Sequence, residues 1–173
     1  ALAKGGRDEQ AVETATEVGV GLVLPWQSER CVSVWQGAKQ AKGRQRWQAT
    51  ALQAAKQARR ARVPEVEEVR DTRELVDWVG KTVQNGGVVL VLHEEAGTPI
   101  STAMESMRLP APGAAPLVLA VVVGPEGGIS PEETAALEAA GAMTVRLGPH
   151  VMRTASAGPV ALAVLAHTSG LWE

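Results

Sequence analysis

Cysteine and long apolar runs are scarce in this 173-residue chain. Its single cysteine, Cys31, excludes an internal disulfide and a metal site built from several thiolates. A lone thiol is usual in the reducing cytoplasm, so we expect a cytoplasmic protein that holds no metal. The longest apolar run, 116–123, has the length of a strand and falls far short of the ~20 residues that cross a bilayer. We therefore expect no membrane partner.

Phenylalanine and tyrosine are absent, which leaves tryptophan as the aromatic residue able to stack on a nucleobase. Trp47 falls on the apolar face of a predicted helix, whereas Trp26 and Trp35 are better candidates for exposure. Packing in the core is nevertheless the favoured interpretation of each. The sequence thus predicts few stacking platforms.

Acidic residues are missing from one long segment, 30–64, which carries nine of the basic residues. The rest of the chain holds eight basic and nineteen acidic residues. Such asymmetry favours a surface that faces a polyanion, although a solvated, arginine-rich helix face would look the same. The nine residues are Arg30, Lys39, Lys42, Arg44, Arg46, Lys56, Arg59, Arg60 and Arg62.

Helices and strands are predicted to alternate along the chain. Apolar spacing and terminating glycines or prolines predict helices over 8–18, 44–60, 72–83, 131–141 and 154–167. Apolar or alternating runs predict strands over 20–24, 31–35, 66–69, 88–92, 117–123 and 144–147. Segment 97–115 is predicted to be loop with one helical turn. This order indicates an α/β fold in one domain over 1–173, a mostly parallel sheet covered by helices on both faces.

Two helix starts carry more specific signals. Ser130 as N-cap, Pro131 at the first helical position and Glu133 at the third form a capping box. Arg153 precedes an apolar helix whose predicted N-cap is Thr154. A cation there opposes the positive end of the helix dipole, so Arg153 is expected to have an anionic or base-edge partner. A surface ion pair is the alternative interpretation.

Two glycine-bearing turns follow apolar strands, at 124–128 and 148–149. Ligands gather beyond the carboxyl ends of parallel strands, and glycine lets the backbone approach them closely. A phosphate fits badly here, because Pro125 has no N–H to donate and Glu126 would repel an anion. The turns therefore favour a ligand without phosphates, such as an adenosine joined to an amino acid. A structural turn is the alternative.

Motifs along nearly the whole chain resemble the RsmE family, bacterial methyltransferases of the SPOUT superfamily that methylate N3 of a uridine in 16S ribosomal RNA. The matching stretches are ALAKG at 1–5, TATEVGV at 14–20, SER at 28–30, RW at 46–47, VPE at 63–65, GPEGGISPEE at 124–133, LG at 147–148 and MRT at 152–154. The resemblance implies a C-terminal trefoil knot, a homodimer, and the small ribosomal subunit as partner. It also implies that the family's N-terminal PUA-like RNA-binding domain lies outside this chain.

The resemblance further implies that S-adenosylmethionine binds in the knot loops. The cofactor residues expected on this basis are Leu92, His93, Glu94, Gly124, Pro125, Glu126, Gly128, Leu147, Gly148, Met152, Arg153, Thr154 and Ala157. The chain departs from the family pattern at His150, where arginine is usual, at Ala155-Ser156, where Glu-Thr is usual, and at Lys56, where an acid is usual. These changes add positive charge near the expected RNA face and remove side-chain partners near the cofactor and uridine.

Catalytic roles follow from the chemistry of uridine N3, which attacks as its anion. A cation beside the uracil carbonyls favours that anion, and Arg153 is the first choice, with Arg30, acting from a partner subunit, the second. Glu126 is a candidate base if it faces the substrate; His150 and His93 are further candidates. Residues expected to bind RNA are Lys4, Arg30, Lys56, Arg59, Arg60 and Arg62. The alternatives are a non-catalytic RNA-binding module of the same fold and a methyltransferase acting on another RNA position.

Overall fold

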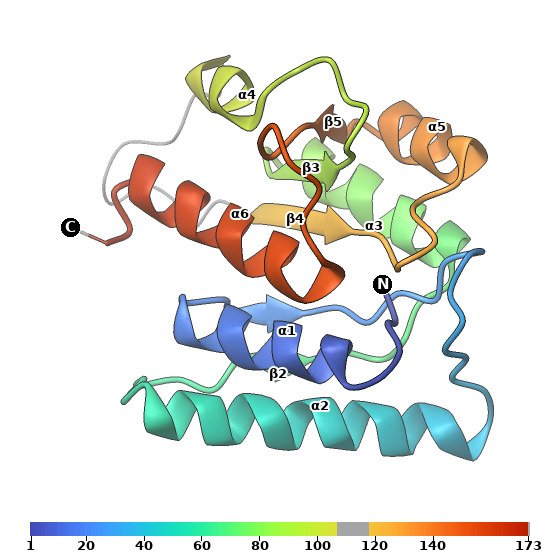
Figure 1. The fold of residues 1–173 in the computed structure, drawn as a ribbon, viewed down its shortest axis with the longest axis vertical. Helices are drawn as coiled ribbons and strands as arrows, with labels where there is room; N and C mark the ends of the chain where they lie inside the picture. Colours follow the sequence, from blue (N-terminus) through green and yellow to red (C-terminus); the bar gives the residue numbers. More distant parts are fainter. Residues whose placement is uncertain (107–117, 173) are drawn as a thin grey trace.

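Five parallel strands form two small sheets in the computed structural model, which describes residues 1–106 and 118–172 (Figure 1). In the larger sheet, β3 (Val88–Leu92) lies between β4 (Leu119–Val123) and β5 (Met143–Val145). Leu92 pairs with both Val123 and Val145, so the three strands end level with one another. The smaller sheet pairs β1 (Leu22–Val23) with β2 (Glu65–Val66). Every strand pair among the described residues is parallel, which confirms the predicted α/β class.

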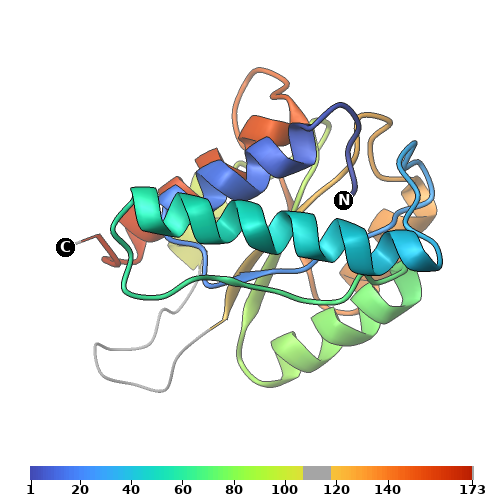
Figure 2. The ribbon, with the colours of Figure 1, turned by 90° about the horizontal axis from the view of Figure 1, so that it is seen from below.

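Six helices accompany these strands within the described residues. They are α1 (Arg7–Glu17), α2 (Ala38–Gln57), α3 (Thr72–Gln84), α4 (Ile100–Ser106), α5 (Pro131–Ala139) and α6 (Thr154–Thr168). Helix α1 lies between α6 and α2, and packs against both (Figure 1). Seen from below, α2 runs alongside α1 across the whole molecule (Figure 2). The basic segment of the sequence thus forms an outer layer.

Alternate residues of β3 belong to two separate apolar cores. Val89 and Val91 pack with Leu137 of α5 and with residues of α3. Leu90 packs instead with residues of α4 and α6. Side chains of a strand point alternately to opposite sides of its sheet, and this explains why β3 reads as a continuous apolar run.

A third core joins α1, α2 and the small sheet, and it contains two of the tryptophans. Trp35 and Trp47 meet edge to face with their ring centroids 5.1 Å apart. Only 2% of Trp26 and 6% of Trp35 is exposed, so both pack in the core, which confirms the favoured interpretation. Trp47 is buried on the inner face of α2, as predicted.

The predicted strand over 31–35 does not form, and α2 begins six residues earlier than predicted. The backbone N–H of Trp35 donates to the side chain of Gln27 at 2.8 Å rather than to a neighbouring strand. The Trp35 ring also explains Gly43 inside α2, since a Cβ built there would lie 2.4 Å from the ring. Gly43 lies one position before the predicted helix over 44–60, and the structure places it inside α2.

Helix α4 lies inside the segment predicted to be loop with one helical turn, and residues 107–115 of that segment fall outside the described part. Strand β4 begins at Leu119 rather than at 117, which also lies outside the described part. The N-cap of α6 is Arg153, one residue before the predicted Thr154. Its carbonyl accepts from the N–H of Ser156 and Ala157 at 2.8 and 3.0 Å, which places Thr154 inside the helix.

The capping box of α5 is confirmed. The hydroxyl of Ser130 accepts from the Glu133 N–H at 3.2 Å, and the Glu133 carboxylate accepts from the Ser130 N–H at 3.3 Å. We expect Ser130→Ala to lower the free energy of unfolding by about 1 kcal/mol, because the cap is lost at a buried site. Urea denaturation measures this change. Ser156→Ala, at an exposed position in α6, is the control and should leave stability unchanged.

Candidate functional site

The carboxyl ends of β3, β4 and β5 open into one cleft, which holds about 720 Å³ of empty space when the open solvent at its mouth is included. Three segments line it, one after each strand. The lining residues are Leu92, His93, Glu94, Val123, Gly124, Pro125, Gly128, Ile129, Arg146, Leu147, Gly148, Pro149, His150, Val151, Met152, Thr154 and Ala157. The structure thus brings together every residue of the expected cofactor set except Glu126 and Arg153.

The turn after β4 needs its glycines for reasons visible in the structure. A Cβ on Gly124 would lie 2.7 Å from Cγ1 of Ile129 and 3.3 Å from the backbone of Gly128. Gly128 has a φ of +73°, in the left-handed region that favours glycine. Its N–H donates to the Pro125 carbonyl at 2.9 Å and closes the turn. The turn therefore brings bare backbone to the cleft.

Glu126 turns away from the cleft. Its Oε1 accepts from the backbone N–H of Lys4 at 3.2 Å and from Nη1 of Arg7 at 3.3 Å. Burial opposes ionisation of Glu126, but hydrogen bonds from its own N–H and from Lys4, with the charge of Arg7, outweigh it and lower the carboxyl pKa. A carboxylate held this way is a poor proton acceptor, and it does not face the substrate side.

Arg153 stands at the rim, between the cleft residues Met152 and Thr154. Its side chain is exposed, and among the described residues no hydrogen bond or ion pair engages it. The cation that opposes the α6 dipole is thus available to an external group. The predicted need for an anionic or base-edge partner is unmet within the described chain.

Arg30 lies against the glycine turn of its own chain. Its Nη1 donates to the Gly127 carbonyl at 3.3 Å. The preceding residue fixes this position, because the Glu29 N–H donates to the buried carboxylate of Glu133 at 2.8 Å. The two proposed catalytic arginines therefore lie at different places: Arg30 contacts the glycine turn, and Arg153 stands at the start of α6.

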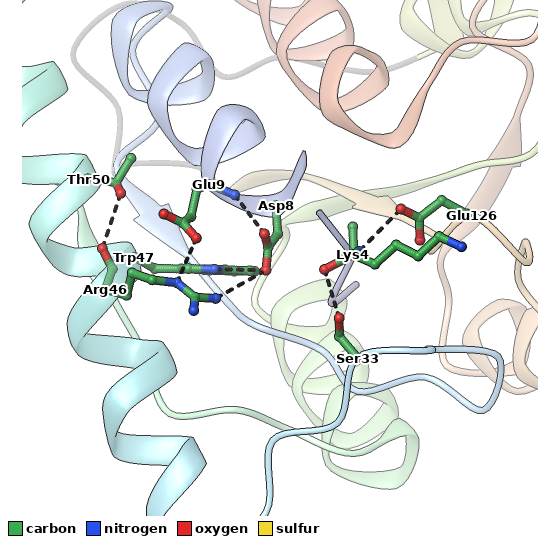
Figure 3. Close-up of polar contacts among 9 residues, drawn as sticks. Lys4, Asp8, Glu9, Ser33, Arg46, Trp47, Thr50 and Glu126 are labelled. Atoms are coloured by element: carbon green, nitrogen blue, oxygen red, sulfur yellow. Dashed lines mark hydrogen bonds and ion pairs between the residues drawn. The ribbon is translucent and has the colours of Figure 1, made fainter. Parts of the chain in front are cut away.

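The basic segment divides into residues used within the fold and residues that face outward. Arg60 donates to the carbonyls of Thr16, Gly19 and Val20, so it satisfies the end of α1. Arg44 and Arg46 pair with Glu68 and Glu9. Five others are exposed and form no ion pair with the described residues: Lys39, Lys42, Lys56, Arg59 and Arg62. Lys4 is also exposed, beside Glu126 (Figure 3).

Sequence reasoning missed several participants. Val123, Ile129 and Arg146 line the cleft, and each lies one position beyond a predicted segment. Proximity to the glycine turns was the available signal for them. Arg7, the partner of Glu126, gave no signal, because the two are 119 positions apart.

Neither a metal site nor a membrane-spanning helix is found in residues 1–106 and 118–172. No group of three or more histidine, cysteine, aspartate or glutamate residues gathers there in a way that could hold a metal ion. No helix in those ranges is long and apolar enough to cross a bilayer.

Comparisons with known proteins agree with this geometry. Residues 1–166 match the family described as RNA methyltransferase domain. The whole chain is 48% identical to the ribosomal RNA small subunit methyltransferase E of Mycobacterium bovis. The crystal structure of a ribosomal RNA small subunit methyltransferase E from Neisseria gonorrhoeae, bound to S-adenosyl methionine, matches 96% of the chain with a TM-score of 0.81 and 26% identity. The SpoU methyltransferase structure from Streptomyces viridochromogenes matches 93% with a TM-score of 0.56 and 12% identity, and so shares the fold alone.

The chain spans 63% of the length of both the Mycobacterium bovis and the Neisseria gonorrhoeae proteins, and 55% of the Streptomyces viridochromogenes protein. The resemblance to the RsmE family, drawn from short motifs, is confirmed over the full chain by the 48% identity.

Proposed function

The chain belongs to the RNA methyltransferase domain family, and from this premise we propose that it binds S-adenosylmethionine in the cleft and methylates N3 of a uridine in 16S ribosomal RNA. One observation carries the proposal: three separate segments meet at the level ends of β3, β4 and β5 to form a single cleft. The resemblance of the same segments to a cofactor-binding family supports it.

The cleft residues suit this cofactor. The apolar side chains of Leu92, Ile129 and Leu147 would pack on the adenine, and backbone groups at the strand ends would meet its polar edge and the ribose. Glu94 is the carboxylate among the lining residues, and it suits a ligand that carries positive charge. Gly124 keeps the backbone close, since no Cβ fits there. Arg146 would meet the ligand's carboxylate.

When bound, S-adenosylmethionine supplies a methyl group on a positively charged sulfur. The protein's part is to align the attacking nitrogen and to favour its deprotonated form. We assign this role to Arg153, whose exposed guanidinium lies at the rim, with Arg30 as the second candidate. Glu126 is not proposed as the base, because Arg7 and Lys4 hold it outside the cleft. His93 and His150 line the cleft and remain the candidate bases.

The remaining features of the family belong to the same proposal. They are a C-terminal trefoil knot, helices on both faces of the sheet, a homodimer that binds RNA across its interface, and a location in the cytoplasm. We propose that residues 1–173 form a single methyltransferase domain. The family resemblance supports each of these features.

The outward-facing cations at the end of α2 are the proposed docking surface for RNA phosphates. We expect Lys56→Ala combined with Arg62→Ala to weaken binding to 16S ribosomal RNA about tenfold. The slope of log affinity against log salt should fall by about 2, since two phosphate contacts are lost. Filter binding over a series of salt concentrations measures both. As a control, Arg73→Ala with Lys81→Ala removes two exposed cations from α3 and should change neither the RNA affinity nor its salt dependence. Equal losses of affinity in both double variants would contradict the proposed docking surface.

Isothermal titration of the chain with S-adenosylmethionine tests the cofactor assignment, and saturable one-site binding is expected. Small ribosomal subunits that lack the modification then serve as substrate. Mass spectrometry of digested nucleosides should detect 3-methyluridine. Binding without any methylated nucleoside would favour a non-catalytic RNA-binding module, and a different methylated nucleoside would move the reaction to another RNA position.

A further inference from the structure

The side chain of Glu126 makes its contacts outside the cleft, although Glu126 belongs to a turn that lines it. Its neighbours Pro125 and Gly128 line the cleft, yet Glu126 points toward the start of α1 (Figure 3). There one carboxylate oxygen meets the backbone N–H of Lys4 and the guanidinium of Arg7. Glu126 therefore links the turn 124–128 to residues 4–7, near the N-terminus.

The contact with Glu126 suits the start of α1. Its N-cap is Gly6, which offers no side-chain cap, and its first residue is the cation Arg7. A positive charge is unfavourable at a helix N-terminus, and the Glu126 carboxylate offsets that of Arg7. Glu126 also accepts from the backbone N–H of Lys4, just before the helix, so each segment stabilises the conformation of the other.

The start of α1 is itself firmly held on its other side. Asp8 is buried and accepts from Nε1 of Trp47 at 3.2 Å, and Glu9 pairs with Arg46 at 2.7 Å (Figure 3). Both partners belong to α2. These contacts fix the position of Arg7 relative to α2. The Arg7–Glu126 pair can therefore restrain the turn 124–128.

We infer that Glu126 is a positioning residue of the cofactor cleft: its contact with Arg7 holds the turn 124–128 in the form that binds the cofactor. The inference rests on the proposed function for the identity of the ligand. Loss of the pair releases the turn, and the turn must then be ordered again when the ligand binds. Affinity for the ligand should fall, while the fold stays intact.

Isothermal titration with S-adenosylmethionine tests this on Glu126→Gln, Arg7→Gln and the double variant. Each single change should weaken binding about threefold to tenfold, since a partly exposed pair contributes modestly and the turn adds its own ordering cost. The double variant should bind no more weakly than the weaker single variant, because both changes break one contact. Arg7→Lys, which keeps the charge, should restore part of the affinity.

Glu68→Gln is the matched control, since it breaks the ion pair with Arg44 of α2 without touching the cleft or the start of α1. It should leave affinity within about twofold of the original chain, even if it lowers the melting temperature as much as Glu126→Gln does. Unchanged affinity in Glu126→Gln and Arg7→Gln, additive losses in the double variant, or an equal loss in Glu68→Gln would each overturn the inference. An unaltered chain that fails to bind the ligand would instead overturn the proposed function.

Discussion

Arg153→Ala should lower the rate of uridine methylation about 10²–10³-fold while leaving S-adenosylmethionine affinity nearly unchanged. Removing one preorganised charge that stabilises a developing anion has an effect of this size. Affinity should persist because the Arg153 side chain does not line the cleft. Single-turnover assays on small ribosomal subunits, with titration of the cofactor in parallel, measure the two quantities separately.

Helix α6 should also survive this change. Arg153 is its N-cap, but the side chain makes no capping hydrogen bond, so alanine removes charge and not helix stability. Arg153→Lys keeps the charge without the planar fork and should recover only part of the rate. Full turnover in Arg153→Ala with intact cofactor binding would remove Arg153 from the reaction and leave Arg30 as the candidate.

Gly124→Ala should weaken S-adenosylmethionine binding at least tenfold and destabilise the fold by about 1–3 kcal/mol. The added Cβ would lie 2.7 Å from Cγ1 of Ile129 and 3.3 Å from backbone atoms of Gly128 and Ile129, so the turn itself must move. Titration calorimetry and urea denaturation measure the two effects.

Gly97→Ala provides the comparison, because a Cβ there meets nothing within 4 Å and Gly97 is exposed. It should leave both affinity and stability close to those of the original chain. A Gly124→Ala protein that binds the cofactor as tightly as the Gly97→Ala protein would show that the turn after β4 does not touch the ligand.

The parallel strands and their ligand-binding ends were predictable because their signals are local. Strand β3 is a continuous apolar run, and the α5 capping box lies within four consecutive residues. The glycine turns follow their strands directly, so the position of the cleft at the strand ends could be predicted from the sequence. These features were predictable because the residues that specify each of them lie close together in the sequence.

Other features depend on contacts between residues that are far apart in the sequence, and the local sequence pattern did not predict these contacts. Arg60 looked like part of the RNA surface, but its guanidinium meets carbonyls of residues 16–20. Glu126 looked like a possible base until its pairing with Arg7 was visible. Gly43 fell just outside the predicted helix over 44–60, whereas the structure places it inside α2, where the ring of Trp35 leaves no room for a Cβ. In each case the partner lies at least eight positions away.

The strand order β4-β3-β5 has a consequence for how the protein is made. Of the three strands in the larger sheet, the central strand β3 is synthesised first, and its neighbours β4 and β5 follow later in the sequence. Pairings between such distant segments form slowly, since a long loop must close before any contact stabilises it. The binding cleft is accordingly a late product of folding, and a nascent chain that ends before α6 exposes the apolar floor it should enclose.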